Sequence, residues 1–121
     1  MNSQVILSVS FYRTGLGAEP VRDWLKDMVG SDKKIIGEDI KLVQYRWPLG
    51  MPLVRKMEPA LWEVRSKIGG NRISRVFFTV SGAEMILLHG FVKKTQKTPK
   101  KDVDLSRSRK DKWFILGEYD E

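Results

Sequence analysis

The sequence predicts an α+β domain in which helices pack against an antiparallel sheet. Apolar residues recur at helical spacing in the first half of the chain, and three strand-like apolar runs joined by short turns follow in the second half. A length of 121 residues with a hydrophobic fraction of 41% is enough for one core but not for two. We therefore expect one domain over residues 1–121.

A strand and two helices are expected in the first half. Residues 4–12 alternate around β-branched and aromatic side chains, as a strand does. Pro20 suits a first helical turn, and Gly30-Ser31-Asp32 should mark a break with a capping residue before the second helix. The apolar positions of that second helix are Ile35, Ile36, Ile40, Val43 and Trp47. Together the two helices should form a helical hairpin over one face of the sheet.

The second half predicts a three-stranded meander and a last helix. Residues 48–59 are rich in proline and glycine, so we expect no regular element there. The runs at 60–66, 72–80 and 84–92 are separated by short glycine-containing turns, which favour antiparallel pairing. Asp102 should cap the C-terminal helix. One stripe of this helix carries Val103, Ser106, Lys110 and Trp113.

Composition excludes several kinds of site. The chain has no cysteine, so it has neither disulfides nor thiolate metal ligands, and His89 is its only histidine. We expect no metal and no cofactor. The N-terminus has no basic segment ahead of an apolar stretch, and no apolar run is long enough to cross a membrane. A soluble, cytoplasmic protein is the expectation.

Positive charge is concentrated in one segment. Residues 93–112 hold nine Lys or Arg and three Asp or Glu, a net charge of +6, whereas the whole chain carries +7. Such a basic patch is typical of nucleic-acid binding. A solvated, lysine-rich start of a helix is the alternative, and charge alone does not choose between them.

Strand geometry places two arginines together. With a period of two, Leu61, Glu63 and Arg65 share one face of their strand, and Arg75 lies on the same side of the next strand. Arg65 and Arg75 should therefore lie side by side on an open sheet face, where planar guanidiniums could bind phosphate. The alternatives are that Arg65 pairs with Glu63 and that His89 is a hydrogen-bonded core residue.

Three segments resemble a known family. LWEVR (61–65), SRVFFTV (74–80) and ILLHGFVKKTQKTPKKDVDL (86–105) are similar to the phage-derived, HigB-type branch of the RelE/HigB superfamily of toxins. That branch typically has L-[WY]-E-L-R, then Y-R-V, then L-L-H-G-F-x-K-K-T-x-K-T-P. The order of strand, helical hairpin, meander and C-terminal helix also resembles the RelE-like fold.

The resemblance implies the toxin of a type II toxin–antitoxin system. Such a toxin is an endoribonuclease (an mRNA interferase) that needs neither metal nor cofactor and cleaves mRNA in the decoding site of the ribosome, so that translation is inhibited. A helix-turn-helix antitoxin would neutralise it. The toxin would bind operator DNA only through that antitoxin. No membrane is implied. The alternative is a non-catalytic basic RNA- or ribosome-binding module on the same scaffold.

The resemblance also implies roles for particular residues. The groups expected to stabilise transition-state charge are Arg65, Arg75 and Lys94. The residues expected to bind RNA are Lys93, Lys97, Lys100 and Lys101. Glu63 is one candidate for the general base, and a lysine that has lost its proton is another.

Overall fold

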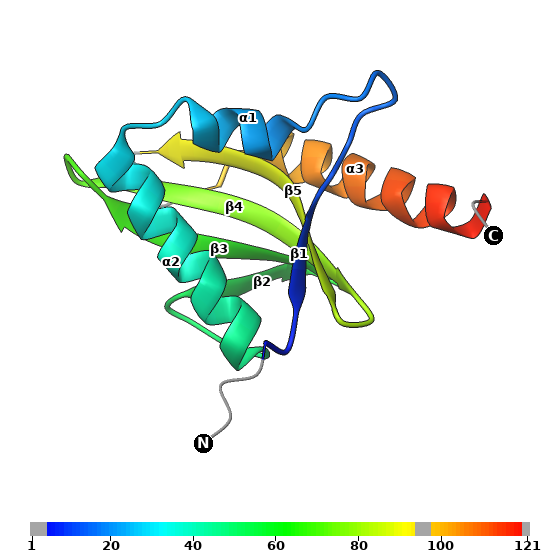
Figure 1. Cartoon of the computed structure of the whole chain (residues 1–121), viewed down its shortest axis with the longest axis horizontal. Coiled ribbons are helices and arrows are strands. Elements are labelled where there is room, and N and C mark those ends of the chain that lie inside the picture. The colour runs from blue at the N-terminus through cyan, green and yellow to red at the C-terminus, as the bar shows by residue number, and fades with distance from the viewer. Residues whose placement is uncertain (1–4, 94–97, 120–121) are drawn as a thin grey trace.

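The computed structural model describes residues 5–93 and 98–119 and confirms the α+β class (Figure 1). Its elements are β1 (Ser8–Phe11), α1 (Pro20–Lys26), α2 (Gly30–Arg46), β2 (Val54–Glu58), β3 (Leu61–Ile68), β4 (Arg72–Ser81), β5 (Glu84–Lys93) and α3 (Lys100–Tyr119). The three expected strands of the second half and the long C-terminal helix are all present.

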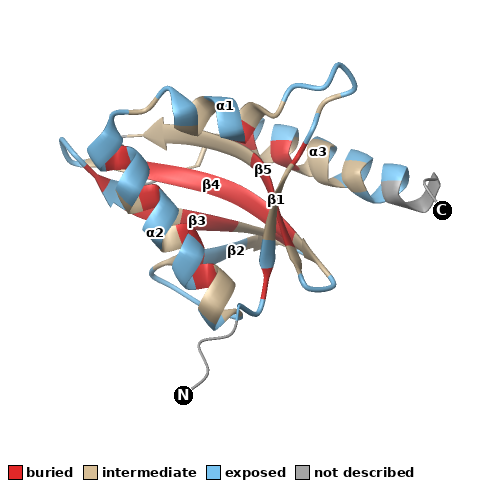
Figure 2. Cartoon of the chain, viewed as in Figure 1, coloured by how far each residue is buried: buried red, intermediate tan, exposed pale blue. Residues whose placement is uncertain are grey.

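The strands form one five-stranded mixed sheet in the order β1-β5-β4-β3-β2. β3, β4 and β5 pair antiparallel with their sequence neighbours, so the predicted meander is confirmed. β1 pairs parallel with β5, which places the first strand beside the last. Figure 2 shows that the central strand, β4, is buried along most of its length.

The segment before the meander differs from expectation. Residues 54–58 form β2, which pairs antiparallel with β3, so the prediction of no regular element over 48–59 was wrong. The prolines at 52 and 59 lie outside this strand and remove none of its hydrogen bonds. β2 pairs with β3 only as far as Val64, and β3 continues beyond it to Ile68.

Helices cover both faces of the sheet. α1 and α2 lie in front of the sheet in Figure 1 and pack on a core that includes Val64, Val76 and Phe78. α3 packs on the opposite face through Val103 and Trp113, against a second cluster. The members of that cluster are Tyr12, Leu61, Phe77, Ile86 and Leu88. The sheet face that we expected to be open is therefore covered in part by α3.

The start of α2 also differs from expectation. α2 begins at Gly30, so residues 30–32 are its first turn rather than a break. Asp32 is not a cap, because its carboxylate reaches the turn between β3 and β4. There it accepts hydrogen bonds from the Gly69 backbone N–H at 3.1 Å and from Arg72 Nη2 at 2.6 Å. Asp32 thus ties α2 to the β3–β4 turn.

This tie predicts a pH-dependent contribution to stability. The hydrogen bonds from Gly69 and then Arg72 hold the pKa of Asp32 below its ordinary value of 3.8. A carboxyl with a lowered pKa in the fold stabilises it while ionised, and this contribution disappears as pH falls through that pKa. We expect Asp32→Asn to lower the free energy of unfolding at neutral pH, and the difference to shrink from about pH 4 downward. Urea unfolding of both proteins across this range measures it.

The matched control is Asp111→Asn, which changes an exposed aspartate of α3. It should leave the free energy of unfolding nearly unchanged at every pH. A difference between Asp32→Asn and the parent that stayed constant from neutral to strongly acidic pH would contradict the prediction.

Candidate functional site

The sheet face beneath α3 carries two cross-strand rows of side chains. The first row consists of Glu63, Phe77 and His89, and the second of Arg65, Arg75 and Phe91. Arg65 and Arg75 are direct cross-strand partners, so their predicted placement side by side is confirmed. We call these six residues the two-row site.

A buried ion pair lies at the centre of this site. Arg75 Nη1 donates a hydrogen bond to Glu63 Oε1 at 2.8 Å, and both side chains have an exposed fraction of 0%. The expectation of an open face was wrong for Arg75, because its side chain has no contact with solvent. A buried charge of this kind is tolerated when it is paired and hydrogen-bonded.

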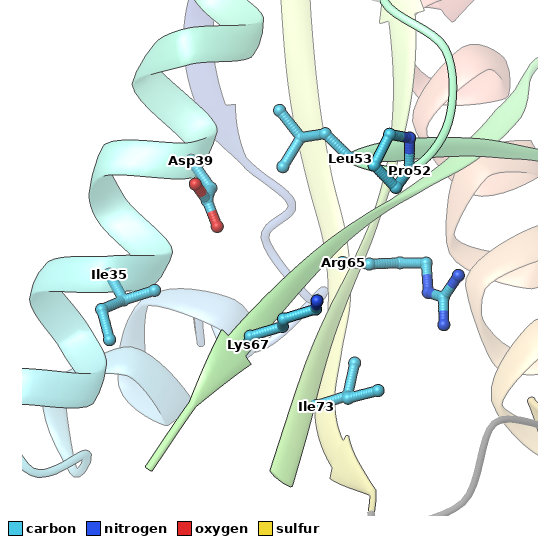
Figure 3. A pocket seen from close by; sticks show the side chains of 7 residues that line it. All are labelled: Ile35, Asp39, Pro52, Leu53, Arg65, Lys67 and Ile73. Atoms are coloured by element: carbon cyan, nitrogen blue, oxygen red, sulfur yellow. The ribbon is translucent and has the colours of Figure 1, made fainter. Parts of the chain in front are cut away.

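Arg65 is the arginine of the site that reaches the surface. Its Nε lies 3.8 Å from Glu63 Oε1, and 17% of its side chain is exposed. It lines a cleft of about 400 Å³ at the edge of the sheet, where β3 extends beyond β2. Figure 3 shows the side chain directed away from α2, which carries Ile35 and Asp39 on the far wall. The other lining residues are Pro52, Leu53, Lys67 and Ile73.

Residues 93–101, which we call the lysine-rich segment, run from the end of β5 to the start of α3. Lys93 is the last residue of β5, half-buried and opposite Ile73. Lys100 and Lys101 are exposed in the first turn of α3. Two predicted residues, Lys94 and Lys97, lie outside the described residues.

A threonine links this segment to the buried pair. Thr98 Oγ1 donates a hydrogen bond to Glu63 Oε2 at 3.4 Å. One oxygen of Glu63 therefore contacts arginine, and the other contacts the chain just ahead of α3. The general-base role of Glu63 stays a prediction from the sequence, whereas its burial favours a role in positioning Arg65 and this segment.

A β-bulge determines where His89 lies. His89 pairs with Phe77 while Leu87 pairs with Phe78, so Leu88 is an extra residue in β5. Leu88 and His89 consequently face the same side, toward α3, although simple alternation would separate them. His89 Nε2 lies 2.7 Å from Asp102 Oδ1, and the imidazole stacks on Phe77 and Phe91 with ring centroids 6.3 and 5.6 Å away. The expectation that His89 is hydrogen-bonded is confirmed, and its side chain is 16% exposed rather than fully buried.

The two residues that follow His89 in β5, Gly90 and Phe91, face opposite sides of the sheet. A Cβ atom on Gly90 would lie 2.5 Å from Cε3 and Cζ3 of Trp24 in α1, so only glycine permits this close packing. Phe91 belongs to the ring stack with His89 and Phe77. His89 and Phe91 therefore belong to the two-row site, and Gly90 between them packs against α1 on the opposite face of the sheet.

α3 is fixed to the sheet by polar contacts along its length. Asp102 is the third residue of the helix rather than its cap, so that prediction was wrong; its carboxylate binds His89 and its carbonyl accepts a hydrogen bond from Ser106. Arg107 donates two hydrogen bonds to Glu58 at 2.6 and 2.8 Å, and these lower the pKa of the Glu58 carboxyl. Arg109 Nη1 donates to the carbonyl of Leu88, the bulge residue, at 2.8 Å.

The chemistry available to the site is that of cations beside a partly buried imidazole–carboxylate pair. Among residues 5–93 and 98–119, no group of three or more histidine, aspartate or glutamate side chains is arranged to hold a metal ion. None of the helices in this described part is long and apolar enough to cross a bilayer. Nothing in the amino-acid sequence marks the bulge or the His89–Asp102 contact.

One family model matches the chain. It is described as "Phage derived protein Gp49-like (DUF891)" and matches residues 23–111, well over half of the sequence. The match runs from α1 into α3 and includes every residue of the two-row site. None of the curated proteins compared with the chain gives a significant match.

Proposed function

Because the chain belongs to the Gp49-like family of phage-derived proteins, we propose that it is the toxin of a type II toxin–antitoxin system. In this proposal it is a RelE/HigB-type endoribonuclease that cleaves mRNA on the ribosome in the cytoplasm, and a helix-turn-helix antitoxin neutralises it. The observation that supports it best is Arg65, which lies beside the buried Glu63–Arg75 pair and lines a cleft together with Ile73, the cross-strand partner of Lys93.

The proposed reaction needs only groups that the chain itself supplies. The RNA 2′-oxygen attacks the adjacent phosphorus, the bond from phosphorus to the 5′-oxygen breaks, and a 2′,3′-cyclic phosphate and a 5′-hydroxyl result. Negative charge builds on the phosphate oxygens in the transition state, where Arg65 and Lys94 would stabilise it. The lysines that would hold the RNA backbone are Lys93, Lys97, Lys100 and Lys101. Arg75, being buried, would position Glu63 and Arg65 rather than touch RNA.

A non-catalytic module that binds RNA or the ribosome is the second candidate. Exposed Lys100 and Lys101 at the start of α3 favour it, because they belong to the segment with a net charge of +6 and require no chemistry. Such a module would bind RNA with an affinity that falls steeply as salt rises, and it would leave the RNA intact.

The deciding experiment is induced expression in a bacterium that lacks an antitoxin, followed by mapping of mRNA 5′ ends. We expect growth arrest and new 5′ ends with the parent chain, and purified mRNA should be cut only when ribosomes are present. Lys94→Ala should relieve the arrest, since a cation at the reacting phosphate is lost.

Lys112→Ala is the matched control, because it removes an exposed lysine farther along α3. It should leave arrest and cleavage intact. Normal growth and unaffected translation at a high level of the parent protein would rule out the toxin proposal. Ribosome association without new 5′ ends would favour the non-catalytic module.

A further inference from the structure

We propose that His89, oriented by Asp102, is the general base that removes the proton from the RNA 2′-hydroxyl. This inference rests on the proposed endoribonuclease function. It assigns the base to a histidine whose place on the sheet depends on a β-bulge, instead of to the buried Glu63.

The first support is the position of His89 relative to Arg65. Both side chains lie on the α3 side of the sheet, on β5 and β3, with β4 between them. Glu63 is the residue of β3 level with His89, and Arg65 lies two residues farther along β3, so two strand spacings and this offset separate the two backbones by about 12 Å. Side chains that extend from both strands can span this gap together with one ribose-phosphate unit. In this arrangement His89 would contact the 2′-hydroxyl of the ribose, and Arg65 would contact the phosphate that the 2′-oxygen attacks.

The second support is the bulge itself. If Leu88 were paired as in a regular strand, alternation would turn His89 toward α1, away from Arg65. Bulges occur preferentially next to active sites, where they re-aim a side chain. Arg109 holds this bulge by its hydrogen bond to the Leu88 carbonyl. The local geometry that brings His89 into the site is thus fixed by a separate contact from α3.

The third support is the state of the imidazole. An ionised carboxylate can only accept, so the 2.7 Å contact with Asp102 favours the proton on Nε2, and in the neutral ring Nδ1 then carries the lone pair. No hydrogen bond to Nδ1 occurs within the described ranges, and 16% of the side chain is exposed. The ring stack with Phe77 and Phe91 fixes the plane of the imidazole. His89 is therefore held as a base with its acceptor nitrogen available.

The charged groups around His89 leave Asp102 as its direct partner. The row of His89 continues through Phe77 to Glu63, whose charge is already paired with Arg75 on β4. From the helix side, Asp102 contacts the ring, and Arg109 binds the neighbouring backbone. The remaining charged groups on this face of β3 are Arg65 and Lys67, which line the same cleft. A negative partner stabilises the imidazolium that forms when the base takes up the proton.

The proton balance of the step follows from these positions. His89 Nδ1 takes the proton of the 2′-hydroxyl as the 2′-oxygen bonds to phosphorus. The bond from phosphorus to the 5′-oxygen breaks, and that oxygen receives a proton from a lysine ammonium of residues 93–101. No metal ion, oxidant or further reactant is required.

The test is the pH dependence of single-turnover mRNA cleavage on ribosomes. With the parent chain we expect the rate to rise with pH and reach a plateau as the imidazole loses its proton. His89→Gln should lower the plateau rate by about 10²- to 10⁴-fold. It should also abolish the rise of the rate with pH below the plateau, which we call the acidic limb. Asp102→Asn should shift that limb and lower the rate less, because the base is present but no longer oriented.

A second measurement does not depend on cleavage. His89 is the only histidine, so its ring nitrogens can be assigned in ¹⁵N NMR spectra of the parent chain without ambiguity. We expect the Nε2–H tautomer at high pH in the parent and a mixture in Asp102→Asn. A parent chain in the Nδ1–H tautomer would overturn the proposal even if both variants failed to fold.

The outcomes separate this inference from the proposed function. If the parent chain cuts no mRNA on ribosomes, the endoribonuclease proposal fails. If the parent cuts and folded His89→Gln keeps both its rate and the acidic limb, the base assignment is wrong and the endoribonuclease proposal stands.

Discussion

Replacing Glu63 with alanine is expected to lower the free energy of unfolding by about 3–5 kcal/mol. The change removes the carboxylate to which Arg75 donates a 2.8 Å hydrogen bond, at a place where both side chains have no exposed surface. The guanidinium would then keep its charge inside the fold without that partner, and desolvation of the charge is what makes the loss large. Urea unfolding of the purified variant measures it.

Glu58→Ala is the matched control. Glu58 also binds an arginine through hydrogen bonds, but 24% of its side chain and 43% of the Arg107 side chain are exposed. Water can hydrate the Arg107 guanidinium after the carboxylate is removed. We therefore expect the free energy of unfolding to fall by about 1 kcal/mol or less. Equal losses in the two variants would show that the burial of the Glu63–Arg75 pair adds nothing to stability.

A double replacement separates stability from function. Glu63→Leu with Arg75→Met removes both charges, and apolar groups of similar volume in place of a buried pair are often neutral or stabilising. This variant should recover most of the stability that Glu63→Ala loses. Under the proposed function it should still cleave mRNA poorly, because Arg65 would lose the carboxylate that lies 3.8 Å from its Nε.

The placement of Arg65 beside Arg75 could be predicted because it depends on local rules. Strand side chains alternate between faces, and the short turn between β3 and β4 fixes the register of the two strands. Those rules placed both arginines and Glu63 on one face. They could not show that α3 would pack on this face or that Arg75 would be buried, since the packing of α3 joins segments far apart in the sequence.

The place of His89 could not be predicted for a different reason. One unpaired residue in β5, Leu88, changes the face of the residue that follows it, and nothing in the apolar run marks which residue is extra. Asp102 was expected to satisfy the start of its own helix. Its carboxylate instead contacts His89, 13 residues earlier, so a tertiary contact prevailed over the local capping preference.

Arg65→Ala should slow mRNA cleavage on ribosomes by about 10²- to 10³-fold, if Arg65 stabilises the charge of the transition state. Its effect on stability should be small. The 3.8 Å separation from Glu63 is longer than a hydrogen bond, and the buried Nε of Arg65 has no hydrogen-bond partner among the described residues, so the change removes no hydrogen bond at this atom. The measurements are single-turnover rates on ribosomes and urea unfolding of the same preparations.

Two variants define what Arg65 contributes. Arg65→Lys keeps the charge and loses the planar fork of donors, so its rate should fall between those of the parent and Arg65→Ala. Lys67→Ala removes a second cation from the same cleft and should change the rate little, because Lys67 is not a cross-strand partner of Arg75.

The kinetic constants then distinguish catalysis from binding at this cleft. A group that acts only in the transition state lowers kcat and kcat/KM equally, whereas a group that merely holds RNA raises KM with kcat unchanged. A pure KM effect in Arg65→Ala would make the cleft an RNA-binding surface. A wild-type rate in Arg65→Ala, together with an inactive Lys94→Ala, would leave the lysine-rich segment as the source of the stabilising charge.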